Sequence, residues 1–241
     1  MTKTYVVCRD SNSLDFLRLI AAVLVLYSHQ FALLGSTDPS FFGWTTFGGA
    51  GVTIFFFLSG MLVWSSWDRD SDLRRFFQRR TLRILPALWV AVVITVFLLG
   101  PFATTRQLTD YFGSTQTWRY FTTAVMVNQH SLPGVFADNP YPTVINGSLW
   151  TLPVEFLCYV SVAIVGSLRL LGKSEALAAT VFCAVIGATY APLFVGARFS
   201  THFEMVAVFW FGALYGYCMQ PMWRASQNTV LTWLLLIGAL L

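Results

Sequence analysis

Arg18 and His29 are ionisable residues inside an apolar stretch, Phe16 to Leu34, where such side chains are rare and usually functional. They are eleven residues apart. On a helix this spacing places both side chains within about 20° of one face and about 16 Å apart along the axis. Arg18 also fits a side chain that reaches the headgroups beside Asp15. His29 lies deeper and needs a hydrogen-bond partner, so it is a candidate general base, with a structural histidine as the alternative.

Glu155 is the candidate partner of His29. It lies seven residues into an apolar stretch that begins at Ser148, hence about 10 Å from the outer end of that stretch, against about 7 Å for His29. A carboxylate at this level can fix the histidine tautomer and support the ring as a base. A structural ion pair is the alternative. Pro153 predicts a kink two residues before the carboxylate.

A group of arginines precedes the third apolar stretch. Arg79 and Arg83 are four residues apart and share a helical face. Such a group suits the phosphates of a polyanionic ligand, although anionic lipid headgroups and membrane topology account for it equally well. The group consists of Arg74, Arg75, Arg79, Arg80 and Arg83.

The elements that carry these residues are expected to be membrane-spanning helices. Apolar residues make up 56% of the 241-residue chain and charged residues 11%, which is typical of an integral membrane protein. We predict an all-α polytopic bundle, a single domain over residues 1–241, with six complete spans and a partial seventh from about Thr229 to Leu241. The six spans are Phe16–Leu34, Phe47–Trp64, Ile84–Phe102, Ser148–Leu171, Ala176–Val195 and Phe203–Met219.

The distribution of basic residues predicts the orientation. With the amino terminus in the cytoplasm, twelve of the fifteen lysines and arginines lie on the cytoplasmic side, as the positive-inside rule requires. Residues 103–147 then form a long external loop, long enough to contact an acceptor. Because the basic residues lie between apolar stretches, the net charge of +4 does not indicate nucleic acid. The cysteines and histidines show no metal-ligand spacing, so we predict no metal site.

Four stretches, in order along the chain, carry a family resemblance. They are Leu14–Arg18 running on to His29, Gly51–Gly60, Arg79–Pro86 and Ser148–Phe156. In these stretches the sequence resembles the acyltransferase-3 family of integral membrane acyltransferases. It departs from the family at Thr53, where many members have an acidic residue, and members usually have about ten spans, so the carboxyl-terminal part of the bundle is expected to be missing.

The resemblance implies a bacterial inner-membrane enzyme that moves an acyl group, often acetyl, from cytoplasmic acyl-CoA to a hydroxyl of a carbohydrate or glycolipid. It implies that His29 is the catalytic base or acyl relay, that Arg18 is its partner, and that Glu155 is the acidic residue. Arg80 and Arg83, with Arg79 beside them, would hold the CoA phosphates. Two alternatives stay open: a proton-coupled transporter or flippase that uses Arg18, His29 and Glu155 as a relay, and an inactive fragment of the family.

Overall fold

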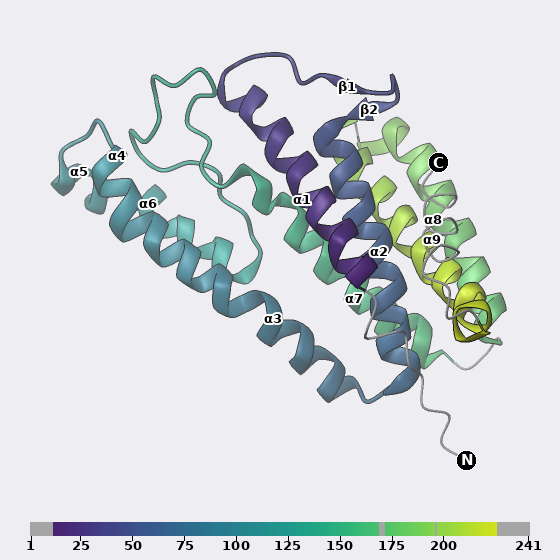
Figure 1. Ribbon diagram of the computed structural model, residues 1–241. Helices are drawn as coiled ribbons and strands as arrows, with labels where there is room; N and C mark the ends of the chain where they lie inside the picture. Colours follow the sequence, from purple (N-terminus) through teal and green to yellow (C-terminus); the bar gives the residue numbers. More distant parts are fainter. Residues whose placement is uncertain (1–11, 169–171, 196, 226–241) are drawn as a thin grey trace. The chain divides into compact units, whose positions relative to one another are not determined.

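Long helices dominate the computed structural model, which describes residues 12–168, 172–195 and 197–225 (Figure 1). Five of the described helices are long and apolar enough to cross a membrane, which supports an integral membrane protein. These candidate spans are Ser13–Leu33, Phe47–Arg69, Leu73–Ala103, Gly147–Ser167 and Lys173–Leu193.

The sixth predicted span lies in helix α9, Ala197–Ala225. This helix is not among the five apolar ones; its first half contains the polar residues His202 and Glu204. The predicted seventh span lies outside the described residues. The count of six plus a partial seventh therefore stays a prediction.

Contacts group the chain into two compact units, and each is described by itself. The α2–α9 unit comprises Met1–His29, Asp38–Phe76 and Leu157–Leu241, and the α3 unit comprises Gln30–Thr37 and Phe77–Phe156. The boundaries fall inside three helices. Residues 30–33 of α1, Asn12–Leu33, and residues 151–156 of α7, Thr151–Ser167, belong to the α3 unit, whereas residues 73–76 of α3, Leu73–Ile94, belong to the α2–α9 unit. The single-domain assignment made from the sequence stays a prediction.

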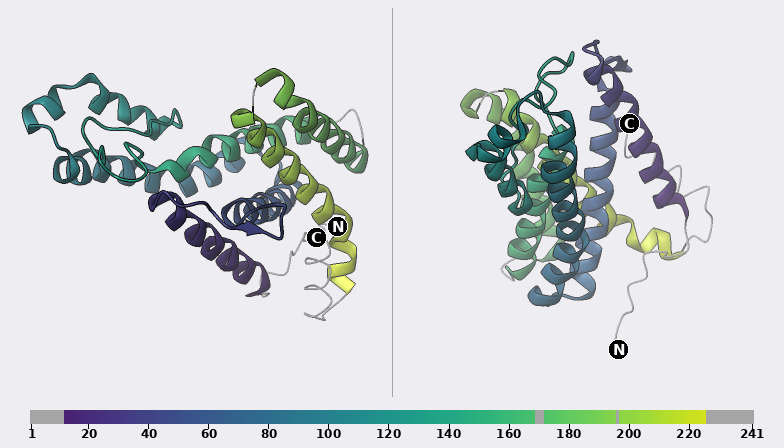
Figure 2. Two further views of the ribbon diagram at one scale, coloured as in Figure 1. Left: turned by 90° about the horizontal axis from the view of Figure 1, so that it is seen from above. Right: turned by 90° about the vertical axis from the view of Figure 1, so that its left-hand side faces the viewer.

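The α2–α9 unit is built around α2, Phe47–Arg69. The Thr46 hydroxyl accepts a hydrogen bond from the Gly49 amide and so caps the helix start. Helix α2 packs on α9, and α8, Lys173–Val195, packs on the other side of α9; Figure 2 shows α8 and α9 side by side. A short antiparallel hairpin of β1, Ser40–Phe41, and β2, Thr45–Thr46, leads into α2.

Glycines allow α2 and α9 to approach closely. A Cβ atom on Gly60 would overlap the carbonyl oxygen of Phe209, and one on Gly212 would overlap that of Phe57. Reciprocal contacts of this kind are typical of membrane helices that pack through small residues. The fully buried Phe57, Leu58 and Met61 complete the contact surface.

Helix α1, Asn12–Leu33, packs more sparsely. Only 17% of its apolar window is buried, against 50% for α2. Its buried apolar residues are Leu17 and Ala21, and Ala21 lies where a Cβ on Gly51 of α2 would approach its carbonyl oxygen. Most of α1 is therefore exposed in this structure.

The α3 unit is organised by α3, Leu73–Ile94, which continues through a π-helical turn, η1 (Thr95–Leu99), into α4, Gly100–Ala103. Three short helical elements follow: α5, Leu108–Gly113; α6, Thr115–Arg119; and η2, Tyr120–Val125 (Figure 1). A fourth, η3 (Gly147–Trp150), leads into α7, Thr151–Ser167. Residues 103–147, predicted as a loop, thus contain helical turns and bury a core of their own against α3. This core contains Leu88, Val92, Val96, Tyr111, Tyr120, Ala124, Leu132, Val135 and Ile145.

Candidate functional site

His29 lies exposed near the carboxyl end of α1. Its Nδ1 is 2.7 Å from the carbonyl oxygen of Val25, one turn earlier. Because a carbonyl oxygen only accepts hydrogen bonds, Nδ1 carries the hydrogen and donates. In the neutral form of the ring that makes this bond, Nε2 has no hydrogen and keeps a lone pair, as a general base or a nucleophile requires.

Arg18 lies on the same uninterrupted helix, so the shared face predicted from the spacing is confirmed for α1. Its guanidinium pairs with the Asp15 carboxylate at 3.2 Å, one turn earlier. The Arg18 side chain is 31% exposed and that of Asp15 is 80% exposed. A position of Arg18 beside Asp15 was the alternative that the sequence left open to a role in the chemistry, and exposed pairs of this kind add little stability.

Glu155 is half-buried on α7. The ring of its neighbour Phe156 packs on Phe77 of α3, with ring centroids 6.3 Å apart. Phe77 precedes Arg79 by two residues, so this ring contact joins the start of α7 to the turn of α3 that carries Arg79 and Arg80. His29 belongs to the α2–α9 unit, and its pairing with Glu155 stays a prediction.

The structure adds two details to the predicted pair. Pro153 lies in the first turn of α7, where the missing N–H has no intrahelical partner to lose, and the kink expected there stays a prediction. The Val25 carbonyl already sets the His29 tautomer.

The arginines of α3 divide between two faces. Arg79 and Arg83 are exposed on one face, as their spacing predicts, whereas Arg80 is only 9% exposed. A buried guanidinium is a fixed charge, while exposed ones can reach a ligand. Arg75 pairs with Asp70 at 3.0 Å, so it has a structural contact at the start of the helix.

A polar network in the α3 unit was not predicted. The Asn146 side-chain nitrogen donates to the hydroxyl oxygens of Thr95, at 2.9 Å, and Tyr120, at 3.0 Å. The Tyr111 hydroxyl donates to the Val96 carbonyl in the π-helical turn at 2.9 Å. The network joins residues up to 51 positions apart, and no local sequence pattern carries that information.

Burial controls the ionisation of the two tyrosines. Burial, with a smaller contribution from nearby Tyr120, raises the pKa of Tyr111 to about 12. Burial also raises the pKa of Tyr120, and its hydrogen bonds to Asn146 and Thr95 partly oppose this rise. Both hydroxyls are therefore neutral hydrogen-bonding groups at neutral pH.

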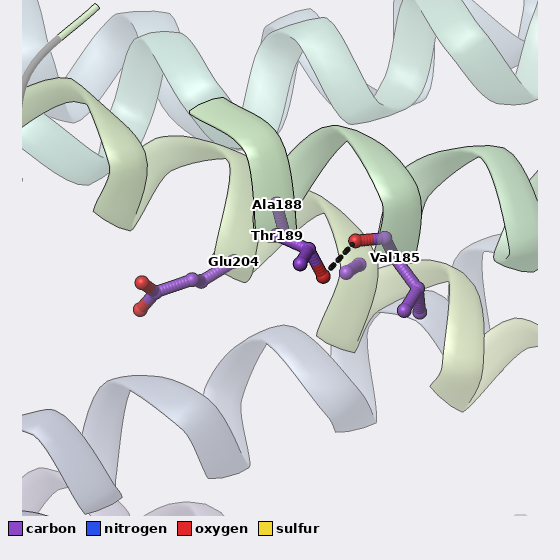
Figure 3. Close-up of a pocket in the computed structure, with 5 residues that line it drawn as sticks. Val185, Ala188, Thr189 and Glu204 are labelled. Carbon is purple, nitrogen blue, oxygen red and sulfur yellow. Dashed lines mark hydrogen bonds between the residues drawn. The ribbon is translucent and has the colours of Figure 1, made fainter. Parts of the chain in front are cut away.

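An open pocket lies between α8 and α9, with a volume of about 390 Å³ (Figure 3). The Thr189 hydroxyl in it donates to the Val185 carbonyl at 2.9 Å, and the Glu204 side chain extends away from that pair (Figure 3). The predicted site residues are not among those that line it, which are Val185, Ala188, Thr189, Glu204 and Ala207. Among the described residues, no group of three or more histidine, cysteine or acidic side chains is arranged to hold a metal ion.

Comparison with known proteins then decides the family. A family model described as an acyltransferase domain, that of the acyltransferase-3 family, matches residues 11–241. The chain belongs to the acyltransferase-3 family. No solved structure matches the chain.

Three named proteins are similar in sequence to parts of this acyltransferase-3 chain. An O-acetyl transferase of Shigella phage Sf6 is 39% identical over 150 residues, 62% of this chain and 44% of the relative. Nodulation protein 10 of Rhizobium leguminosarum bv. viciae is 35% identical over 160 residues, 62% of this chain and 42% of the relative. The peptidoglycan O-acetyltransferase OatA of Listeria monocytogenes is 33% identical over 90 residues, 35% of this chain and 13% of the relative. In each case the match covers less than half of the relative's length.

Proposed function

We propose that this chain is a membrane-bound O-acyltransferase domain. It transfers an acyl group, with acetyl-CoA as the expected donor, to a hydroxyl of a carbohydrate or similar acceptor of the cell envelope. Membership of the acyltransferase-3 family supports this proposal, as do the names of two relatives as O-acetyltransferases. We place the domain in the bacterial inner membrane with its amino terminus in the cytoplasm, on the distribution of basic residues.

The hydrogen bond from His29 Nδ1 to the Val25 carbonyl is the observation that carries the chemical proposal. In direct transfer, Nε2 takes the proton of the acceptor hydroxyl as its oxygen attacks the thioester carbonyl. The C–S bond then breaks, and the CoA thiolate leaves and takes up a proton. In the relay route, Nε2 itself attacks the carbonyl, the C–S bond breaks and the CoA thiolate leaves. The acceptor oxygen then attacks the acyl group, the N–C bond to the imidazole breaks, and the proton of the acceptor hydroxyl passes to the thiolate.

The other predicted residues receive supporting roles in this proposal. Glu155 stabilises the protonated ring, and Arg18 lies along the donor path on the His29 face of α1. Arg79 and Arg83 contact the CoA phosphates, since guanidinium groups match phosphate geometry. Arg80, buried in the same helix, contributes positive charge from behind that surface.

Substituting His29 tests the proposal. Membranes containing the full protein are incubated with radiolabelled acetyl-CoA, and label in the envelope glycans is measured. We expect His29→Ala to lower the rate of acetyl transfer by about 10²- to 10⁴-fold, because a positioned general base contributes a factor of that size. Gln30→Ala, on the next exposed position of α1, is the matched control and should retain activity.

Two results contradict the proposal. Wild-type transfer by an expressed His29→Ala protein would remove His29 from the chemistry. If wild-type membranes place no label on glycan or protein, the transporter alternative, which needs no CoA, is favoured instead.

A further inference from the structure

Ser28 and Asp38 form a polar contact at the end of α1 that carries His29. Ser28 immediately precedes His29 and is 8% exposed. Its hydroxyl donates to Asp38 Oδ2, ten residues further along the chain. Both residues belong to the α2–α9 unit, so the contact lies within one compact unit together with His29.

This contact matters because α1 has few others. Only 17% of the apolar window of α1 is buried, and the Arg18–Asp15 ion pair joins two residues of the same helix, so it cannot hold α1 to anything else. Ser28 also lies against Gly48 of α2, where an added Cβ would overlap the Ser28 hydroxyl. The His29 end of α1 thus has two described contacts with its surroundings: the ring of Tyr27 packs edge-on against Phe47 of α2, and the buried Ser28 hydroxyl lies between Asp38 and Gly48.

The carboxylate depends on this hydroxyl in turn. Asp38 Oδ1 is enclosed, and no residue within the described ranges donates a hydrogen bond to it. The described hydrogen bond to the Asp38 carboxylate therefore comes from Ser28. A hydrogen bond to a charged carboxylate is stronger than one between neutral groups. If the Asp38 carboxylate lost this donor, no hydrogen bond would offset the free-energy cost of its burial. The bond therefore holds both side chains in place.

We propose that Asp38 is a positioning residue for His29 and that it acts through Ser28. This inference rests on the proposed function. Asp38 fixes the end of α1 in one orientation about the helix axis and at one position along that axis. This places Nε2 of His29 at its reaction distance. A base displaced by about 1 Å can lose about 10²-fold in rate even when its own chemistry is intact.

The test uses the full protein, acetyl-CoA and the envelope glycan of the producing cell. We expect Asp38→Ala and Ser28→Ala each to lower kcat by about 10- to 100-fold and to leave the KM for acetyl-CoA unchanged. Asp38→Asn keeps an acceptor oxygen for Ser28 and should recover most of the activity. The double variant should be no slower than either single variant, since both remove one contact. Glu175→Ala removes an exposed carboxylate of the same unit and should match the wild type.

A second readout does not depend on turnover. The rate at which diethyl pyrocarbonate modifies His29, measured by mass spectrometry, should change in Asp38→Ala and Ser28→Ala but not in Glu175→Ala. If the wild type transfers no acetyl group, the proposed function fails and this rate still tests the positioning. Unchanged kcat and an unchanged modification rate in Ser28→Ala would overturn the inference. So would an Asp38→Asn protein that folds but is as slow as Asp38→Ala. If Asp38→Ala does not fold, Ser28→Ala decides.

Discussion

At the scale of residues, three neighbouring arginines of one motif have different surroundings. Arg79 and Arg83 project from one face of α3, and Arg80 is turned into the protein. The exposed pair can contact phosphates directly, so individual substitutions should have different effects on donor binding.

Substituting Arg83 tests this division. Arg83→Ala should raise the KM for acetyl-CoA by about 10- to 100-fold, as expected for one lost hydrogen bond to a charged group, with kcat at saturation nearly unchanged. Arg74→Ala is the control, because nine residues place Arg74 on the opposite face of α3. Equal KM values for the two variants would contradict a phosphate contact at Arg83.

Residue-scale predictions from the sequence succeeded where the contact follows helical spacing. Arg18 pairs with Asp15 because residues three apart are neighbours on a helix. The Val25 carbonyl as the His29 partner was not predicted, since it depends on the rotamer of one ring. Asp38 was missed because it lies in a segment without periodicity, where nothing in the sequence indicates which helix it contacts.

At the scale of elements, the close approach of α2 and α9 depends on Gly60 and Gly212. Small residues such as Gly60 in the second apolar stretch are typical of close helix packing, but they do not identify the partner helix. Adjacent spans in sequence need not be adjacent in space, so this information is absent from a single sequence.

Gly60→Val should separate α2 from α9. The added side chain would meet the backbone of Phe209 rather than a movable side chain, so we expect destabilisation of at least about 1–3 kcal/mol. Thermal unfolding in detergent would report this as a lower Tm. Gly113→Val is the matched control, because nothing lies within 4 Å of a Cβ atom there. Similar Tm values for both variants would show that the α2–α9 contact tolerates a side chain.

The same scale explains why residues 103–147 were predicted as a loop. Their helices are at most six residues long. This is too short for the helical spacing of apolar residues to be recognised in the sequence. Their core instead depends on single large residues such as Tyr111 and Tyr120, which become buried only when α3 is beside them.

At the scale of the whole molecule, the chain has two compact units whose cores differ in kind. The α2–α9 unit is held by long helices with glycine contacts, and the α3 unit by aromatic residues with buried hydroxyls. The core of the α3 unit should therefore respond to alkaline pH, because it contains Tyr111 and Tyr120, two tyrosines outside the predicted spans whose pKa is raised.

Alkaline pH should destabilise the protein through Tyr111. Its pKa is about 12 in the folded chain against an ordinary value of 10.0. Below pH 10 the hydroxyl is neutral in both states. Between pH 10 and 12 the unfolded chain loses the proton first, so folding stability falls as pH rises. The Tm of the wild type should fall more steeply over this interval than that of Tyr111→Phe. Parallel Tm curves would contradict the assignment.

Asn146 gives the α3 unit one more property. The triplet Asn146-Gly147-Ser148 has the pattern of an N-glycosylation acceptor. The nitrogen that a glycan would occupy already donates hydrogen bonds to Thr95 and Tyr120. A sugar at that atom would replace one of its two hydrogens and break at least one of these hydrogen bonds, so modification of the triplet competes with the folded network once the unit has formed.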